Sequence, residues 1–264
     1  MQVWTVANQK GGVGKTTTAV ALGGLLAERG KRVLLIDLDP HGSLTSYFGH
    51  DLDKITKSCY ELFVTESALS GEDIWDLCVA TDVSGLNLLP TAPALATVER
   101  QMTGKEGMGL RVDRALAEIA GDVDYVLLDC PPVLGVLMIN ALAACERLII
   151  PVQTEFLSLK GLERMTRTIE MIQKARPQAL KVNVLPTMFD RRTQASVSSL
   201  HSLRRYYPTQ VWRSAIPVDT RLRDASRNGV VPSVFSPDSR AVRAYKQFLA
   251  EVLESDKAQN LARA

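Results

Sequence analysis

Cysteine is scarce in this chain, which has only four among 264 residues, at Cys59, Cys78, Cys130 and Cys145. None of them forms a Cys-x-x-Cys pair or stands at a zinc-site spacing from a histidine, so the sequence argues against a zinc site and a disulfide framework. We expect four thiols that pack as small hydrophobic groups.

Long hydrophobic runs are also missing. No segment approaches the roughly 20 apolar residues of a membrane span, and the start, MQVWTVANQK, lacks the charged and apolar regions of a signal peptide. The last ten residues, SDKAQNLARA, lack the bulky apolar face of an interfacial helix. We therefore expect a cytoplasmic protein without stable membrane insertion.

Charge is nearly balanced over the whole chain, with a formal net charge of +2, but it is distributed unevenly. From Arg191 to Lys246 there are eleven Lys and Arg against three Asp, a net charge of +8, and the remainder of the chain is net −6. A contrast of this size within one chain suggests an anionic partner such as nucleic acid.

Short runs rich in Val, Ile and Leu alternate with longer amphipathic stretches. The runs predicted as strands are VWTVA, RVLLID, LNLLP, YVLLDCPP, RLIIPVQ, VNVLPTM and VWRSAIP. Helical spacing covers residues 16–29, 111–120, 161–175, 197–206 and 240–254. Several strands are apolar on both faces, so we expect an α/β fold with a doubly wound, mostly parallel sheet and helices on both faces. Residues 1–254 are predicted to form one domain, followed by a flexible tail over residues 255–264.

A glycine-rich loop, NQKGGVGKTTT, joins the first strand to the first helix. Such a loop turns successive backbone N–H groups and a helix N-terminus toward one point, which suits phosphate. Gly11, Gly12 and Gly14 allow close approach of the backbone, with Val13 between them, Lys15 reaches the β- and γ-phosphates, and Thr16 is placed to ligate Mg²⁺. Thr17 is expected at the α-phosphate. The alternative, a simple turn with an exposed lysine, does not account for GKTT at a strand-to-helix junction.

Three aspartates stand at the ends of predicted strands. Asp37 and Asp39 follow RVLLI two residues apart and project from one face, and Asp129 ends YVLLD. In P-loop proteins a carboxylate at such a strand end helps to hold Mg²⁺. A purely structural role remains the alternative for Asp37 and Asp39.

These motifs resemble those of the ParA/MinD group of deviant Walker A ATPases, and most closely its ParA/Soj branch. The resemblance extends over nearly the whole chain, through KGGVGKT, LLIDLDPHGS, LLDCPP, the triplet NAL at 140–142, PVQTEFLSLKGL and TMFDRRT. It implies an ATP-dependent homodimer in which Lys10 reaches the phosphates held by the other subunit. It also implies that Asp39 orients the attacking water, that Thr16, Asp37 and Asp129 organise Mg²⁺, and that hydrolysis is slow and stimulated by a ParB-like or cargo-adaptor partner.

Two positions depart from the family pattern. His41 stands where DPQG has glutamine; it is either a harmless replacement or a source of pH-sensitive dimerisation. The family segment IPRNVRLSEAP reads IPVDTRLRDAS here, from Ile216 to Ser226. Pro217 is still expected to wall the adenine, whereas a base contact at Asp219 is in doubt.

The cargo of such a switch is either a DNA locus or a large protein assembly, and the sequence leaves both open. For nonspecific DNA binding, the candidate residues are Arg204, Arg205, Arg221 and Arg223, although a solvated helical face would have the same composition. A metabolic P-loop ligase or synthase is a third interpretation, for which no substrate motif is evident. The nitrogenase iron-protein relatives do not fit, because the cysteines do not match their cluster-binding pattern.

Overall fold

The computed structural model describes residues 1–65, 67–102, 108–174, 176 and 179–261. One seven-stranded sheet has the order β3-β4-β2-β5-β1-β6-β7 and is parallel except for the antiparallel pair β3 and β4. The strands are β1 (Gln2–Val6), β2 (Val33–Asp37), β3 (Val79–Ala80), β4 (Leu86–Leu89), β5 (Tyr125–Asp129), β6 (Arg147–Gln153) and β7 (Lys181–Thr187).

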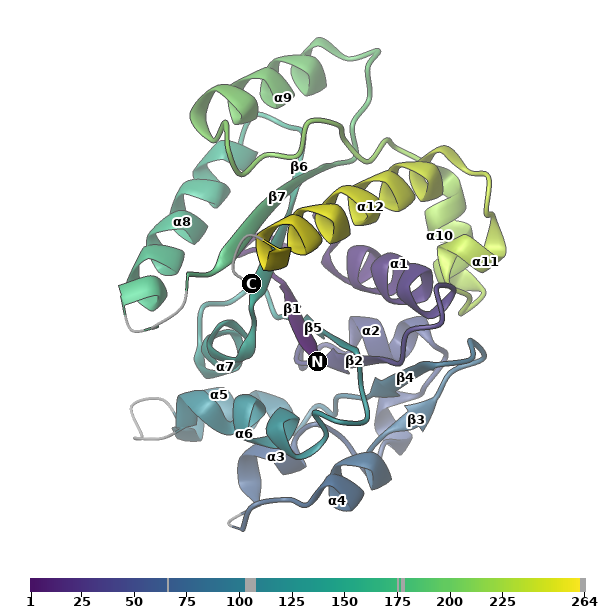
Figure 1. The fold of residues 1–264 in the computed structure, drawn as a ribbon, viewed down its shortest axis with the longest axis vertical. Helices are drawn as coiled ribbons and strands as arrows, with labels where there is room; N and C mark the ends of the chain where they lie inside the picture. The colour runs from purple at the N-terminus through teal and green to yellow at the C-terminus, as the bar shows by residue number, and fades with distance from the viewer. Residues whose placement is uncertain (66, 103–107, 175, 177–178, 262–264) are drawn as a thin grey trace.

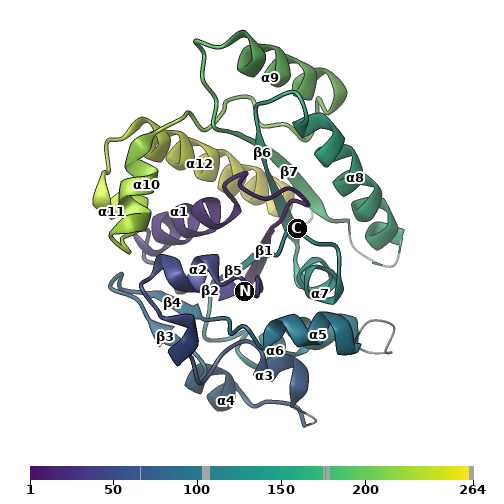
Figure 2. The same ribbon diagram turned by 180° about the vertical axis from the view of Figure 1, so that it is seen from behind.

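Helices cover both faces of the sheet (Figures 1 and 2). One face carries α1 (Lys15–Ala27), α2 (Ser43–Tyr47), α10 (Thr220–Arg227), α11 (Pro232–Phe235) and α12 (Arg240–Leu261). The other carries α3 (Glu61–Val64), α4 (Gly71–Asp76), α5 (Leu95–Met102), α6 (Arg111–Glu118), α7 (Val136–Ala144), α8 (Ser158–Lys174) and α9 (Gln194–Tyr206). Short 3₁₀ turns span Leu52–Lys54 and Met108–Leu110.

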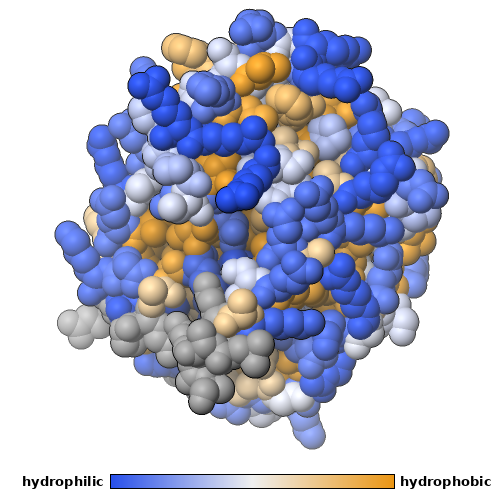
Figure 3. All heavy atoms as spheres, turned by 45° about the horizontal axis from the view of Figure 1, so that its top comes forward, coloured by the Kyte–Doolittle hydropathy of each residue, from blue (hydrophilic) through white to orange (hydrophobic). Residues whose placement is uncertain are grey.

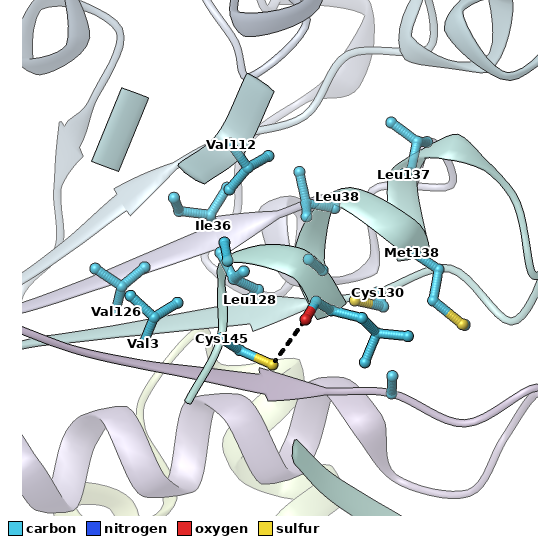
Figure 4. Packing of buried hydrophobic residues seen from close by; sticks show 14 of the residues in the cluster. Val3, Ile36, Leu38, Val112, Val126, Leu128, Cys130, Leu137, Met138 and Cys145 are labelled. Carbon is cyan, nitrogen blue, oxygen red and sulfur yellow. Dashed lines mark hydrogen bonds between the residues drawn. The ribbon is translucent and has the colours of Figure 1, made fainter. Parts of the chain in front are cut away.

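The strands are apolar throughout because alternate residues enter two different cores. In β5, Val126 and Leu128 pack among α6 and α7, whereas Leu127 packs with α1. Figure 4 shows residues of the first of these cores, among them Val3, Val126, Leu128 and Cys145, whose Sγ donates to the Leu142 carbonyl at 3.7 Å. The doubly wound, two-faced sheet expected from the sequence is confirmed.

The segment VWRSAIP is not a strand, contrary to the prediction. It runs beside β7 and touches it at two points, where Trp212 N–H donates to the Val184 carbonyl and Ile216 N–H to that of Pro186. Between these bonds β7 advances two residues and the other segment four, so the intervening residues bend away from the ladder. The short strand β3 was not predicted, because two residues carry no periodic pattern.

The last helix extends beyond its predicted end at Glu254. α12 continues to Leu261, so residues 255–261 are helical where the sequence led us to expect a flexible tail, and residues 262–264 lie outside the described part of the chain. Asp256 accounts for the extension, because it forms ion pairs with Arg147 at 2.6 Å and with Lys181 at 2.5 Å. The Arg147 side chain is only 4% exposed, so the end of α12 neutralises a buried charge.

Candidate nucleotide site

The carboxyl ends of β1, β2 and β5 lie side by side at one edge of the sheet. The register pairs Val6 with Asp129 and Asp129 with Asp37, so the glycine-rich loop after β1 and the aspartates of its neighbours converge. This is the edge at which doubly wound sheets bind ligands. The structure therefore brings together the loop and the strand-end carboxylates that the sequence singled out separately.

The loop itself has the shape of an anion cradle. Gly12 and Gly14 have φ angles of 73° and 90°, in the left-handed region that favours glycine, and Gly14 is the N-cap of α1. A Cβ atom added to Gly11, Gly12 or Gly14 would meet nothing within 4 Å, so the space over the loop is open. A phosphate group placed there would meet the N-terminus of α1.

Contacts from β6 and β7 hold the cradle in place. Asn8 Nδ2 donates to the Pro151 carbonyl at 2.7 Å, and Thr187 Oγ1 donates to the carbonyl of Val13 at 2.9 Å. Val13 is buried and Lys15 is only 8% exposed. The loop is thus positioned by neighbouring strands before any ligand arrives.

The carboxylates beside the cradle are buried and electrostatically coupled. Burial raises the pKa of Asp37 to about 7, although Thr45 donates to the same carboxylate from its backbone N–H and its hydroxyl. Burial, followed by the nearby charge of Asp37, raises the pKa of Asp129 to about 8. A cation between these carboxylates and a phosphate would stabilise the charged form of both aspartates and so lower both pKa values.

Thr16 and Asp129 fit Mg²⁺ as they stand. Thr16 Oγ1 donates to Asp129 Oδ2 at 2.6 Å, while Asp129 Oδ1 is buried without a hydrogen-bond partner in the described residues. Among those residues no group of three or more His, Cys, Asp or Glu side chains forms a metal cage. Mg²⁺ at phosphate sites is typically held by one or two carboxylates together with the phosphates and water, so a cage is not required. Both Asp37 oxygens already accept protein hydrogen bonds, which favours contact with Mg²⁺ through water.

A pocket of about 560 Å³ opens from the cradle toward α10 and α12. Gly14 and Thr17 form its inner end, Pro217 lies in its wall, and Arg223 and Arg227 line its side. Asp219 also borders the pocket, but its carboxylate caps two helices, accepting from Arg221 N–H of α10 and Ala241 N–H of α12, both at 3.1 Å. A base contact from the Asp219 side chain would compete with both caps.

The four arginines predicted for DNA binding do not form one group. Arg204 and Arg205 lie at the end of α9, whereas Arg221 and Arg223 lie on α10, beyond the start of α12 in Figure 1. Between these helices Arg191, Arg192 and Arg240 line a hollow of about 630 Å³ that adjoins the pocket at Pro217, Val218 and Asp219. Figure 3 shows the face around α9, where hydrophilic side chains surround hydrophobic ones. Spacing along the chain did not indicate that Arg223 borders the pocket beside the cradle, or that Arg240 and Arg191 line one hollow.

An α/β fold with a phosphate-binding loop, a threonine–aspartate pair for Mg²⁺ and an adjoining base-sized pocket defines a P-loop nucleotide-binding protein. A family model described as an AAA domain matches residues 1–182. Over 252 residues the chain is 36% identical to the sporulation initiation inhibitor protein Soj of Bacillus subtilis, covering 95% of this chain and 98% of Soj. It is 37% identical to the chromosome-partitioning ATPase Soj of Thermus thermophilus, covering 94% of each. The chain belongs to the ParA/Soj family of ATPases.

Solved structures share the fold over nearly the full length. A Mycobacterium smegmatis protein named cobyrinic acid a,c-diamide synthase, with bound ADP and magnesium, has a TM-score of 0.84 and 36% identity, covering 98% of this chain and 96% of that one. An ATP complex of a McdA variant from Cyanothece has a TM-score of 0.82 at 22% identity, covering 95% and 96%. No described helix is long and apolar enough to cross a membrane.

Proposed function

We propose that this chain is an ATP-driven switch for partitioning or positioning cargo in a bacterial cell, in which two copies enclose two ATP molecules. The observation that carries the proposal is the placement of Lys10. Its ammonium forms an ion pair with Glu155 beside the glycine-rich loop. The Lys10 side chain is 31% exposed there, so a second molecule could contact it. Lys10, the extra lysine of the loop, is thus partly exposed, while Lys15 serves the cradle of its own chain.

Exposed hydrophobic residues near Lys10 support a face for a second copy. Phe156 is 82% exposed and Leu157 60%, directly after Glu155, and Val133 is 61% exposed after the Asp129 strand. Burial of such residues favours association, and lysines delivered across the interface would neutralise the phosphates. Dimerisation would then report the nucleotide state.

Within this proposal ATP binds with its phosphates on Gly11 to Thr17, while Thr16 and Asp129 hold Mg²⁺, which would neutralise charge on the β- and γ-phosphates. Asp39 lies beside the cradle and orients water for slow hydrolysis, which a ParB-like or adaptor protein stimulates. DNA-bound dimers moving a DNA locus are the first form of the proposal. The positioning of a large protein assembly, with weak or no DNA binding, is the alternative. The site of action is the cytoplasm, on the nucleoid or at a pole with the cargo.

The test measures ATP turnover and assembly together. With Mg²⁺, ATP but not ADP should convert monomers to dimers in sedimentation velocity, and Asp39→Ala should dimerise with ATP while hydrolysing it at least about a hundredfold more slowly. ATP turnover at the native rate in Asp39→Ala would show that another residue orients the water. Equal sedimentation with ATP and with ADP would overturn the proposal of an ATP-driven switch.

A metabolic reaction is the second candidate, because a full-length neighbour at 36% identity is named as a diamide synthase. Amide synthesis would require ATP consumption that depends on a carboxylate substrate and a nitrogen donor. ATP turnover that rises with added glutamine or ammonia and a corrinoid acid, without dimerisation, would favour this candidate over the switch.

A further inference from the structure

The side chain of Asp39 is held from one side. Its Oδ1 atom accepts from the backbone N–H of His41 at 3.0 Å and lies 2.8 Å from Nδ1 of the His41 imidazole. Within the described residues, every hydrogen bond to this carboxylate ends at Oδ1. Because an ionised carboxylate can only accept, Nδ1 is the donor in this contact. Oδ2 is left for another partner.

The imidazole is not needed for the shape of the loop. Gly42 N–H donates to the Asp39 carbonyl at 2.8 Å, and Asp39 N–H donates to the side-chain Oδ1 of Asp37 at 3.1 Å, so these two hydrogen bonds already fix the turn without the imidazole. The His41 side chain is 81% exposed, whereas that of Asp39 is 11% exposed. The polar contact with Asp39 is therefore the interaction by which the His41 ring is tied to the site.

We propose that His41 is a positioning residue for hydrolysis, whose Nδ1–H holds Oδ1 so that Oδ2 faces the attacking water. This inference rests on the proposed function. In the reaction the water oxygen bonds to the γ-phosphorus, the bond to the bridging oxygen breaks, and ADP leaves with that electron pair. The water proton departs by way of the Asp39 carboxylate and ends in solvent. A carboxylate free to rotate would meet the water in the correct geometry less often.

The test compares two replacements of the ring. His41→Asn keeps an N–H donor near the place of Nδ1, and His41→Leu keeps bulk without a donor. The leucine variant should lose about tenfold or more in kcat, as for a hydrogen bond to a charged group, with KM for ATP within about twofold because the cradle is intact. The asparagine variant should recover most of the loss. His201→Leu, an exposed histidine on α9, is the matched control and should keep the native kcat.

Sedimentation with a non-hydrolysable ATP analogue separates positioning from assembly. Equal dimerisation of all variants is expected, and weaker dimerisation of His41→Leu would overturn the inference, as would native kcat in His41→Leu or failure of His41→Asn to recover. In an Asp39→Ala background the leucine replacement should have no further effect. If Asp39→Ala itself hydrolysed at the native rate, the proposed function of Asp39 would fail, a result distinguishable from failure at His41 alone.

Discussion

The ammonium of Lys10 donates a hydrogen bond to Oε1 of Glu155 in its own chain, across 145 residues of sequence. In the proposed dimer the same ammonium must reach the phosphates of the partner. In that dimer the pair within one chain would compete with the contact between chains, so Glu155 would act against premature assembly.

Removing the charge of Glu155 should ease dimerisation. Both side chains are about one-third exposed, so solvent screens the pair, and Glu155→Gln should lower the protein concentration needed for ATP-dependent dimers by about two- to fivefold. Lys10→Ala should weaken dimerisation while monomers still bind ATP. Sedimentation equilibrium at several protein concentrations measures both effects. Asp51→Asn, which breaks the exposed pair with Lys54, is the control, and weaker dimers in Glu155→Gln would show that Glu155 itself contacts the partner.

The raised pKa of Asp129 predicts that this residue lowers the stability of the folded protein increasingly as pH rises. The folded chain holds this proton up to about pH 8, whereas the unfolded chain releases it near its ordinary value of 3.8. The folded state therefore loses stability as pH rises between these values. Without nucleotide, Asp129→Asn should gain in Tm relative to the native protein between pH 6 and pH 9, as followed by thermal unfolding.

A partly exposed aspartate, Asp190, provides the control for this titration. Hydrogen bonds from Arg192 lower the pKa of Asp190 to about 2, so Asp190→Asn should show no pH-dependent difference over the same range. Parallel Tm profiles of native protein and Asp129→Asn would contradict the prediction. Mg²⁺ with ATP should stabilise the native protein and not the variant, because the metal needs the charged carboxylate.

Arg223 should affect nucleotide binding more than DNA binding, contrary to its assignment from the sequence. It lines the pocket that begins at Gly14 and Thr17, and no described residue forms an ion pair with it. Arg223→Ala should weaken ATP binding about three- to tenfold, the loss typical of a partly exposed charged contact. Arg205→Ala, on the exposed end of α9, should leave ATP binding unchanged. Isothermal titration of the two variants with ATP decides between the roles. Equal ATP affinities would contradict the role in nucleotide binding and favour a contact of Arg223 with DNA.

Duplex DNA binding is best tested without Arg223. The locked Asp39→Ala dimer should bind random duplex DNA, and Arg204→Glu, Arg205→Glu and Arg221→Glu together should abolish retention. If these three arginines of each subunit contact phosphates, log affinity should fall with log salt at a slope on the order of −5. Lys54→Glu, outside the basic segment, is the control. If the ATP-bound Asp39→Ala dimer does not bind DNA even at low salt, a protein cargo is favoured.

Local chemistry made much of the fold and cradle predictable. Strand formation by β1, β2 and β5 and the turn made by the glycines at 11, 12 and 14 depend on residues that are close in sequence. The strand-to-helix loop and the aspartates beside it could therefore be expected at one edge of the sheet. Contacts between distant segments could not. The partnership of Lys10 with Glu155, the caps made by Asp219 and the place of Arg223 depend on how elements pack, which spacing along the chain does not encode.

The ion pairs of Asp256 decide where the chain can be shortened for experiments. A variant that ends at Glu254 looks harmless in sequence, yet it would leave the guanidinium of Arg147 buried without its counter-charge, a loss of about 3 to 5 kcal/mol in the folded state. Affinity tags and fluorescent fusions at this end therefore need a linker that starts after α12. The phenotypes of truncations that remove Asp256 would reflect local unfolding of the sheet edge near β6 and β7, and not the loss of a partner-binding tail.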